Sequence, residues 1–198
     1  MCGIAGLIDR RAETPLETLQ RIGQAMTDSM LHRGPDAGGL WCAPEAGVAL
    51  GHRRLSIIDL SPGGAQPMIS ASEQFVIVYN GEVFNFLDLR TELEKAGVRF
   101  RGGSDTEVIL EGCARWGVAA TVKRLIGMFA FALWDRKTRT LSLVRDRLGI
   151  KPVYYLANDR LFAFGSELKA LRACPGWTPS IDRDALSGYL RLAYVPQP

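Results

Sequence analysis

The sequence predicts an α+β protein in which layers of helix cover mainly antiparallel sheets. Strand-like stretches follow one another in runs, and amphipathic helical stretches fall into separate groups. The short turns RKTR at 136–139 and NDR at 158–160 join neighbouring strands, which favours antiparallel hairpins. The chain contains no internal repeat and no low-complexity segment.

The length and composition indicate one soluble domain of ordinary size, or a domain with a short tail. Hydrophobic residues make up 47% and charged residues 23% of the 198 residues, as in ordinary globular proteins. The net charge of +3 comes from scattered basic residues, and no apolar stretch reaches membrane-spanning length. We therefore expect no nucleic-acid partner and no membrane partner.

The cysteines show no metal-binding pattern. Cys2, Cys42, Cys113 and Cys174 are 40, 71 and 61 residues apart, without a CxxC pair or a Cys/His cluster. We therefore expect no metal site. For the last three cysteines the simplest interpretation is a small, reduced core side chain. A cytoplasmic location fits this cysteine usage best.

The N-terminal part predicts a strand followed by a helix. Residues 2–9, CGIAGLID, have the apolar character of a strand. In the TPLE stretch that follows, Thr14 can cap a helix, Pro15 suits its first position and Glu17 completes a capping box. Apolar residues at helical spacing continue to Met30, and a segment containing Gly and Pro then ends regular structure.

The middle of the chain predicts further strands and two helices. The expected strands are 39–43, 48–59 and 73–81. The stretch 86–97 is an amphipathic helix with Gly97 as its C-terminal stop. SDTE at 104–107 is a second capping box, which opens a helix that runs to about Trp116.

The C-terminal third predicts two hairpins and then two helices. The expected strands are 127–135, 140–146, 153–157 and 161–166, and the expected helices are 166–173 and 183–190. We expect one domain over residues 2–190. Residues 191–198 then begin a linker to a further domain that lies downstream.

Cys2 directly follows the initiator methionine, which suggests a nucleophile at a mature chain terminus. A thiol has an unperturbed pKa near ~8.5 and a free α-amine one near ~7.7–8.0. An amine with this pKa is partly neutral at working pH, so it can accept a proton directly or through one water. Once Met1 is removed, one residue would supply a nucleophile and its base. Chance or a small buried side chain is the alternative, because a lone cysteine before Gly3 is a weak signal.

A series of motifs occurs in order across nearly the whole chain. They are CGIAG at 2–6, HRGPDAGG at 32–39, HRRLSIIDL at 52–60, AQPM at 65–68, YNGEVFN at 79–85, GSDTEVIL at 103–110, GMFAFALWD at 127–135, RDRLGIKPVYY at 145–155 and FGSELKAL at 164–171. The series resembles the glutamine amidotransferases with an N-terminal cysteine, and the Pro35–Asp36 pair favours their asparagine-synthetase-like branch. The resemblance implies the N-terminal-nucleophile (Ntn) hydrolase fold, a four-layer α/β/β/α sandwich of two mainly antiparallel sheets.

The resemblance implies catalytic roles for three residues. Cys2 would attack the side-chain amide of glutamine, and the tetrahedral oxyanion that forms needs hydrogen-bond donors. The side chain of Asn80 and the backbone N–H of Gly81 would be these donors, at a strand end where glycine allows a close approach. The dipeptide Asn80–Gly81 is also typical of a type I′ hairpin turn, which is the alternative to a catalytic role.

The resemblance also implies substrate-binding residues. The planar guanidinium of Arg54 would clamp the α-carboxylate of glutamine, and a solvated strand-end arginine is an equal alternative. Glu82 and Asp105 would meet the α-ammonium group, although a carboxylate at Asp105 is also favoured by the first turn of a capped helix. The residues expected to line the pocket through backbone atoms are Leu55, Ser56, Ile57 and Ile58.

Other polar segments have simpler interpretations. His32 and His52 could be general bases, but the α-amine of Cys2 would make this unnecessary, so structural histidines are expected. The segment SPGGAQP at 61–67 lacks the pattern of a phosphate-binding loop. The run RDRLGIK at 145–151 is interpreted as a strand exit with solvated charges, although the resemblance places it near the active site.

The sequence departs from the family pattern in two ways. Phe84 stands where a tyrosine is common, and no ATP-pyrophosphatase loop occurs before Pro198. We therefore expect no cofactor in this domain. ATP and Mg are expected only in a C-terminal ATP-dependent synthetase domain, which would be its partner.

The activity that the resemblance implies is hydrolysis of L-glutamine to glutamate and ammonia through a Cys2 thioester. The ammonia would pass to an asparagine synthetase-type domain that converts aspartate and ATP to asparagine. Open alternatives are an idle regulatory or scaffold domain, an amidase for another substrate, and a nitrogen acceptor other than aspartate, such as a surface sugar. A homodimer is among the oligomeric states that the sequence allows.

Overall fold

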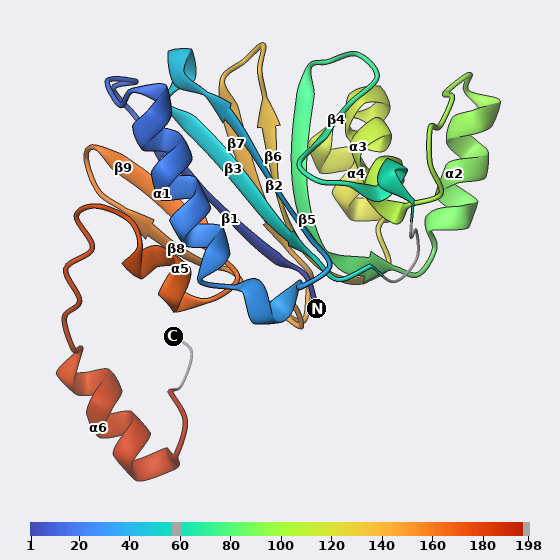
Figure 1. The fold of residues 1–198 in the computed structure, drawn as a ribbon. Helices are drawn as coiled ribbons and strands as arrows, with labels where there is room; N and C mark the ends of the chain where they lie inside the picture. The colour runs from blue at the N-terminus through green and yellow to red at the C-terminus, as the bar shows by residue number, and fades with distance from the viewer. Residues whose placement is uncertain (57–60, 196–198) are drawn as a thin grey trace.

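The protein is built from two stacked sheets with helices on both outer faces (Figure 1). This computed structural model describes residues 1–56 and 61–195. Its strands and helices are β1 (Gly3–Asp9), α1 (Leu16–Asp28), β2 (Ala37–Ala43), β3 (Val48–Arg54), β4 (Met68–Ile69), β5 (Phe75–Val83), α2 (Phe86–Lys95), α3 (Asp105–Trp116), α4 (Val118–Arg124), β6 (Gly127–Asp135), β7 (Thr140–Arg145), β8 (Tyr154–Ala157), β9 (Leu161–Gly165), α5 (Leu168–Arg172) and α6 (Arg183–Leu192).

The layer order is helix, sheet, sheet, helix. One sheet has the strand order β2-β3-β1-β9-β8, the other has the order β4-β5-β6-β7, and all these pairs are antiparallel. Helix α1 packs on β1, β2 and β3, whereas α3 packs on β5 and carries α2 and α4 beside it (Figure 1). The expected α+β class and α/β/β/α sandwich are therefore confirmed.

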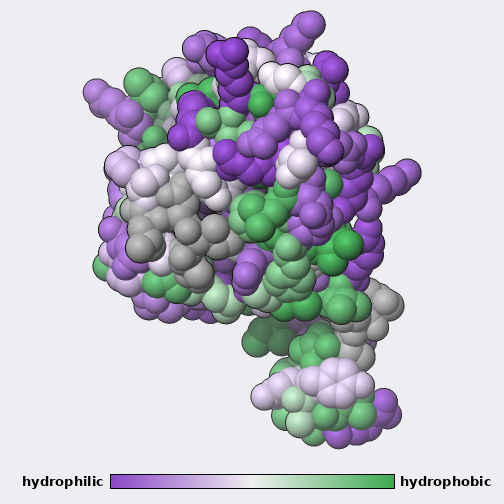
Figure 2. Space-filling model, turned by 90° about the vertical axis from the view of Figure 1, so that its right-hand side faces the viewer, coloured by the Kyte–Doolittle hydropathy of each residue, from purple (hydrophilic) through white to green (hydrophobic). Residues whose placement is uncertain are grey.

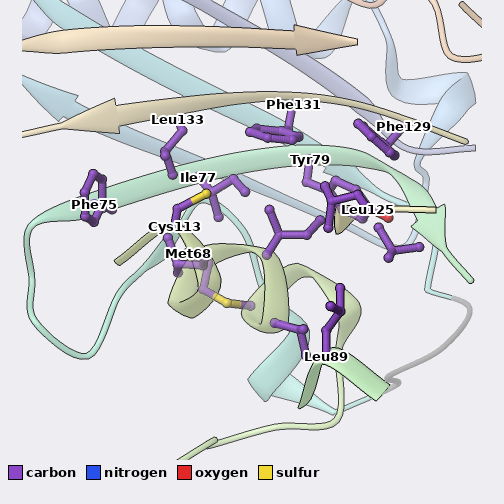
Figure 3. Close-up of a cluster of buried hydrophobic side chains, with 14 of the residues drawn as sticks. Met68, Phe75, Ile77, Tyr79, Leu89, Cys113, Leu125, Phe129, Phe131 and Leu133 are labelled. Carbon is purple, nitrogen blue, oxygen red and sulfur yellow. The ribbon is translucent and has the colours of Figure 1, made fainter. Parts of the chain in front are cut away.

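Strict alternation along β5 assigns its side chains to two cores. Val76 and Val78 are fully buried between the sheets, in one cluster with Ile4 of β1. Ile77 and Tyr79 face the opposite way, into a cluster shared with the helix layer (Figure 3). This cluster also contains Met68, Phe75, Leu89, Cys113, Leu125, Phe129, Phe131 and Leu133. Each face of β5 is therefore sealed by a different layer.

The expected capping of the first helix is wrong. Pro15, not Thr14, is the N-cap residue of α1, and no side chain caps this end. The hydroxyl and the N–H of Thr14 instead donate to Asp9, a buried carboxylate at the end of β1. Because a buried carboxylate needs donors more than a solvated helix end does, Asp9 takes the hydroxyl that would otherwise cap α1.

Other differences concern short or terminal elements. The strand expected at 48–59 ends at Arg54, and its last three residues lie outside the described part of the chain. The short strand β4 and the helix α4 were not predicted, because two and seven residues carry little periodicity. In contrast, Ser104 caps α3 by accepting the N–H of Glu107, as predicted.

Helix α6 lies away from the two-sheet body (Figure 1). None of its residues is buried, and Leu186, Tyr189 and Leu190 are exposed apolar side chains. In the side view of Figure 2 it projects below the body and shows hydrophobic and hydrophilic side chains together. None of the helices in residues 1–56 and 61–195 has the length and apolar character required to cross a membrane.

His52 links the two sheets near the end of β3. Its ring is buried, and Nε2 lies 3.1 Å from the carbonyl oxygen of Tyr79 on β5, so Nε2 carries the proton and donates it. Burial lowers the pKa of His52 from 6.5 to about 4, although the bond to Tyr79 opposes this shift. His52 is therefore a neutral structural histidine, as the sequence predicts.

The depressed pKa of His52 makes the stability of the fold depend on pH. Below pH 6.5 the unfolded chain binds a proton that the folded chain excludes, so the free energy of unfolding falls as pH falls towards 4. From pH 7 to pH 5 this one group should remove about 2 kcal/mol. In His52→Gln the decrease should be smaller by this amount, as measured by urea unfolding at both pH values. His32→Gln, which leaves His52 intact, should keep the wild-type decrease, and equal decreases in wild type and His52→Gln would contradict the assignment.

Candidate active site

A cleft opens at the end of the sandwich where β1 begins and β3 and β5 end. Its water-accessible volume is about 90 Å³, and it is open to solvent. Its walls are formed by Met1, Cys2, Arg54, Leu55, Ser56, Gly64, Gln66, Tyr79, Asn80, Gly81, Glu82, Ser104, Asp105, Thr106, Met128 and Lys151. The cleft therefore brings Cys2 together with Asn80, Gly81, Glu82, Arg54, Leu55, Ser56 and Asp105 from the sequence prediction. Ile57 and Ile58 lie outside the described residues.

The thiol of Cys2 points into the layer between the two sheets. Ile4 lies in the inter-sheet cluster, and alternation from Ile4 sends Cys2 to the same side. The Cys2 Sγ accepts the N–H of Leu55 at 3.3 Å and lies 3.5 Å from the Leu55 carbonyl oxygen. The end of β3 thus fixes the position of the sulfur.

The surroundings of Cys2 favour the protonated thiol. Burial raises its pKa, and the nearby carboxylate of Asp105 acts in the same direction. The hydrogen bond from Leu55 and the positive charges of the chain terminus and Arg54 oppose this shift without cancelling it. A base is therefore needed before the sulfur can act as a nucleophile.

Arg33 holds the backbone of Cys2 in place. Its Nε donates to the Cys2 carbonyl oxygen at 2.9 Å, and its Nη1 donates to Glu167 at 3.1 Å. Burial opposes ionisation of Glu167, but hydrogen bonds from Arg33, Lys169 and His32 lower its pKa to about 2. The HRG motif was noted in the sequence, but this contact to Cys2 could not be inferred from it.

Asn80 presents an unused hydrogen-bond donor. Its side chain is 2% exposed and lies on the inter-sheet face of β5, the side on which Cys2 lies. Its Nδ2 is buried and has no hydrogen-bond partner. Because buried amides are nearly always paired, this free N–H favours a site for a ligand oxygen.

The backbone N–H of Gly81 points to the edge of β5 that faces away from β6. Gly81 lies opposite Phe129 of β6, whose own N–H and carbonyl bond to Asp146 on the far side of β6. The Gly81–Phe129 pair is therefore not hydrogen-bonded, and the Gly81 N–H points away from β6. The N–H groups of Tyr79 and Val83 point to the same edge, where they donate to Gln66 and Asp105.

Asn80 and Gly81 do not form a hairpin turn. Both lie within β5, opposite Ala130 and Phe129 of β6, so the structural alternative from the sequence is wrong. A glycine is required at position 81 because a Cβ would lie 2.5 Å from the carbonyl oxygen of Met128. The backbone of Gly81 is therefore close to the neighbouring strand β6.

The predicted substrate-binding side chains surround these donors. Glu82 shares the inter-sheet face of β5 with Asn80, and Asp105 is the first residue of α3. Arg54 ends β3, where its Nη1 donates to the carbonyl oxygen of Ser61 at 3.0 Å. The cleft therefore combines one guanidinium and two carboxylates around the thiol of Cys2.

Two residues of the loop 146–151 are buried, and one of them lines the cleft, so the interpretation as solvated charges is wrong for these two. Asp146 and Lys151 are each 6% exposed. Asp146 accepts four backbone N–H groups, from Phe129, Leu148, Ile150 and Lys151. This folds the loop back so that Nζ of Lys151 lies 3.2 Å from Sδ of Met1. The placement near the site that the resemblance implied is confirmed.

Within residues 1–56 and 61–195, no group of three or more His, Cys, Asp or Glu side chains is arranged to hold a metal ion. The chemistry that these side chains can supply is nucleophilic attack by sulfur, stabilisation of a developing negative oxygen and recognition of charged groups.

Solved structures confirm the fold. A glutamine phosphoribosylpyrophosphate amidotransferase from B. subtilis, in complex with ADP and GMP, superposes with a TM-score of 0.73 at 20% identity. A structure described as the allosteric regulatory enzyme of purine biosynthesis gives a TM-score of 0.71 at 21% identity. Each match covers 87% of this chain and 43% of the other chain. At this identity the likeness establishes the Ntn amidotransferase fold alone.

The sequence identifies the family within this fold. The family sequence model described as "Glutamine amidotransferase domain" matches residues 1–198. The chain therefore belongs to this family. It is 42% identical over 191 residues to the glutamine-hydrolysing asparagine synthetase 3 of Bacillus subtilis, covering 94% of this chain and 30% of the relative. It is 43% identical over 180 residues to a putative glutamine-hydrolysing asparagine synthetase of Mycobacterium tuberculosis, covering 85% and 27%. The chain thus spans about 30% of the length of these relatives.

The four donors to Asp146 lead to a prediction for hydrogen exchange. Burial alone would raise the pKa of Asp146, but its backbone donors outweigh burial and hold the pKa below its ordinary value. Asp146→Asn replaces a carboxylate that accepts four N–H groups by an amide with one acceptor oxygen. The amides of Leu148, Ile150 and Lys151 should exchange roughly 10- to 100-fold faster, as measured by mass spectrometry of the peptide that carries them.

The matched control is Asp135→Asn, because Asp135 accepts the amides of Lys137 and Thr138 in the β6–β7 turn. It should speed exchange in that turn and leave the loop 146–151 unchanged. Unchanged exchange in this loop on Asp146→Asn would show that Asp146 does not hold it.

Proposed function

We propose that this chain is a glutaminase domain that hydrolyses L-glutamine to glutamate and ammonia. The observation that carries the proposal is the half-buried thiol of Cys2 in one cleft with the unpartnered Nδ2 of Asn80. The family and the names of the relatives, glutamine-hydrolysing asparagine synthetases, support glutamine as the substrate.

Removal of Met1 would activate the nucleophile. Met1 lines the cleft, and the thiol pKa of Cys2 is raised by burial, so the sulfur needs a base. The new α-amine of Cys2 is this base. It takes the thiol proton, directly or through one water, as the sulfur attacks the carboxamide carbon of glutamine.

Attack converts the amide carbonyl into a tetrahedral oxyanion. The Nδ2 of Asn80 and the N–H of Gly81 donate to this oxygen, and neither group must reorganise during the step. The protonated amine returns its proton to the leaving nitrogen, the C–N bond breaks, and ammonia leaves behind a Cys2 γ-glutamyl thioester. Water then attacks the thioester, the amine takes a proton from this water, and the thiol recovers a proton as glutamate departs.

Charged side chains would select an amino-acid amide. Arg54 binds the α-carboxylate of glutamine, and Glu82 and Asp105 bind its α-ammonium group. Leu55 and Ser56 contribute backbone atoms beside the sulfur, together with Ile57 and Ile58. Two carboxylates and a guanidinium on the cleft wall match the charges of a free amino acid and favour glutamine over a simple amide.

The partner that we propose is a C-terminal ATP-dependent synthetase domain of the asparagine synthetase type, which receives the ammonia. The relatives extend well beyond the matched region, and their names combine glutamine hydrolysis with asparagine synthesis. ATP and Mg would bind there, and this domain would need no cofactor in the cytoplasm. A boundary at 190/191 remains our prediction, and the finding that no residue of α6 is buried favours a boundary before Arg183.

Replacing the nucleophile should abolish the activity. With Cys2→Ala, release of glutamate from glutamine should fall to background, because no thioester can form. Cys42→Ala is the matched control, since Cys42 is also a half-buried free cysteine but does not line the cleft, and its activity should be unchanged. Intact mass should show loss of Met1 in the active protein. Turnover in Cys2→Ala, or activity confined to chains that retain Met1, would refute the mechanism and favour an idle scaffold.

Replacing the oxyanion donor should affect the chemical step. Asn80→Ala removes one of two donors, so kcat should fall roughly 100- to 1000-fold while KM changes only a few-fold. Asn158→Ala, in the turn between β8 and β9, should leave both constants unchanged. A large rise in KM with an intact kcat would assign Asn80 to substrate binding instead.

A further inference from the structure

The carboxylate of Asp105 is fixed by two donors from β5. The hydroxyl of Tyr79 donates to Asp105 Oδ2 at 2.6 Å, and the N–H of Val83 donates to the same oxygen at 3.0 Å. Tyr79 is 3% exposed and Asp105 is 4% exposed. Both side chains nevertheless border the cleft that contains Cys2.

Tyr79 reaches Asp105 through the apolar core. Its ring lies on the helix-facing side of β5, among side chains that include Phe131 and Leu125 (Figure 3). The backbone of Tyr79 is held at both polar groups. Its N–H donates to Gln66 at 2.6 Å and its carbonyl accepts from His52 at 3.1 Å. Because the backbone of Tyr79 is fixed by these two hydrogen bonds and its ring is rigid, its hydroxyl is held beside Asp105, the first residue of α3.

The hydroxyl also supports the negative charge of Asp105. Burial raises the pKa of Asp105, and the hydrogen bonds from Tyr79 and Val83 oppose that rise. Burial and the nearby Asp105 charge raise the pKa of Tyr79 well above its ordinary value, so its hydroxyl stays a neutral donor. Without this hydroxyl, Asp105 would keep the Val83 N–H as its donor from β5.

We infer that Tyr79 is a positioning residue that sets selectivity for a substrate with an α-ammonium group, because its hydroxyl holds the Asp105 carboxylate in place. This inference rests on the proposed function, in which Asp105 binds the ammonium group of glutamine. Tyr79 acts through Asp105 and has no part in the attack by Cys2. The side chain of the neighbouring Asn80 points to the opposite face of β5 and is left unchanged.

The test compares two thiol reagents on Tyr79→Phe. The diazoketone analogue of glutamine (6-diazo-5-oxo-L-norleucine) carries an α-ammonium and a carboxylate, whereas iodoacetamide carries neither. In Tyr79→Phe, labelling of Cys2 by the glutamine analogue should slow roughly 5- to 20-fold at subsaturating concentration, and KM for glutamine should rise by a similar factor. Labelling by iodoacetamide and kcat should stay within two-fold. Intact-mass spectrometry follows both labels.

Matched variants isolate the effect. Tyr155→Phe, on a tyrosine that is 67% exposed on β8, should label like wild type with both reagents. In an Asp105→Asn background, Tyr79→Phe should add less than a two-fold change, because the hydroxyl acts through the carboxylate. Should Tyr79→Phe fail to stay folded, 3-fluorotyrosine at position 79 decides. The hydroxyl of 3-fluorotyrosine is a stronger hydrogen-bond donor than that of tyrosine, so KM for glutamine should not rise. A raised KM would overturn the inference.

The outcomes separate this inference from the proposed function. If wild type reacts with iodoacetamide at Cys2 but neither hydrolyses glutamine nor takes up the diazoketone, the proposed function is wrong. If wild type does both and Tyr79→Phe keeps its KM and its diazoketone rate within two-fold, only the role of Tyr79 is wrong. Equal slowing with both reagents would show a general distortion of the cleft and would also overturn the inference.

Discussion

The pairing of β5 with β6 is the constraint on which the site depends. It sets Asn80 opposite Ala130 and Gly81 opposite Phe129, and it thereby fixes the direction of every side chain and N–H group at the end of β5. A slip of one residue would turn Asn80 into the helix-facing core and bring Tyr79 between the sheets. The geometry of the cleft is therefore set by the register of a buried sheet rather than by loop conformation.

Burial of polar groups follows from placing the cleft inside a sandwich. A polar group removed from water is costly unless it is paired. The carboxylates of Asp105 and Asp146 have hydrogen-bond partners from neighbouring elements, and so has Nε2 of His52. The Nδ2 of Asn80 has none, and an unpaired buried donor costs about 1–3 kcal/mol. At Asn80 this unpaired donor lies in a residue that lines the cleft, where a ligand oxygen would remove the cost.

The sequence was sufficient to predict the α+β fold class, because the alternation of strand residues and the residues typical of turns can be recognised locally. The helix α3 with its Ser104 cap and the hairpin of β6 and β7 are examples. The local sequence could not separate a strand from a turn at Asn80–Gly81, since only pairing with β6 decides between them. The oxyanion role proposed for these two residues comes from the family motifs. Loop charges were misjudged for the same reason, because the burial of Asp146 depends on donors that the sequence does not show.

The balance of charges at Cys2 explains why chain processing belongs to the proposed mechanism. Burial dominates the thiol pKa and raises it, whereas Arg54 and the terminal ammonium oppose the shift only in part. Before processing, the α-amine belongs to Met1, one residue or about 3.8 Å further along the backbone. Removal of Met1 breaks the peptide bond to Cys2, so that the nitrogen of Cys2 itself becomes the free α-amine. The same burial that makes the thiol a poor acid then leaves its sulfur poorly solvated, and a poorly solvated sulfur next to its own base is the more reactive nucleophile.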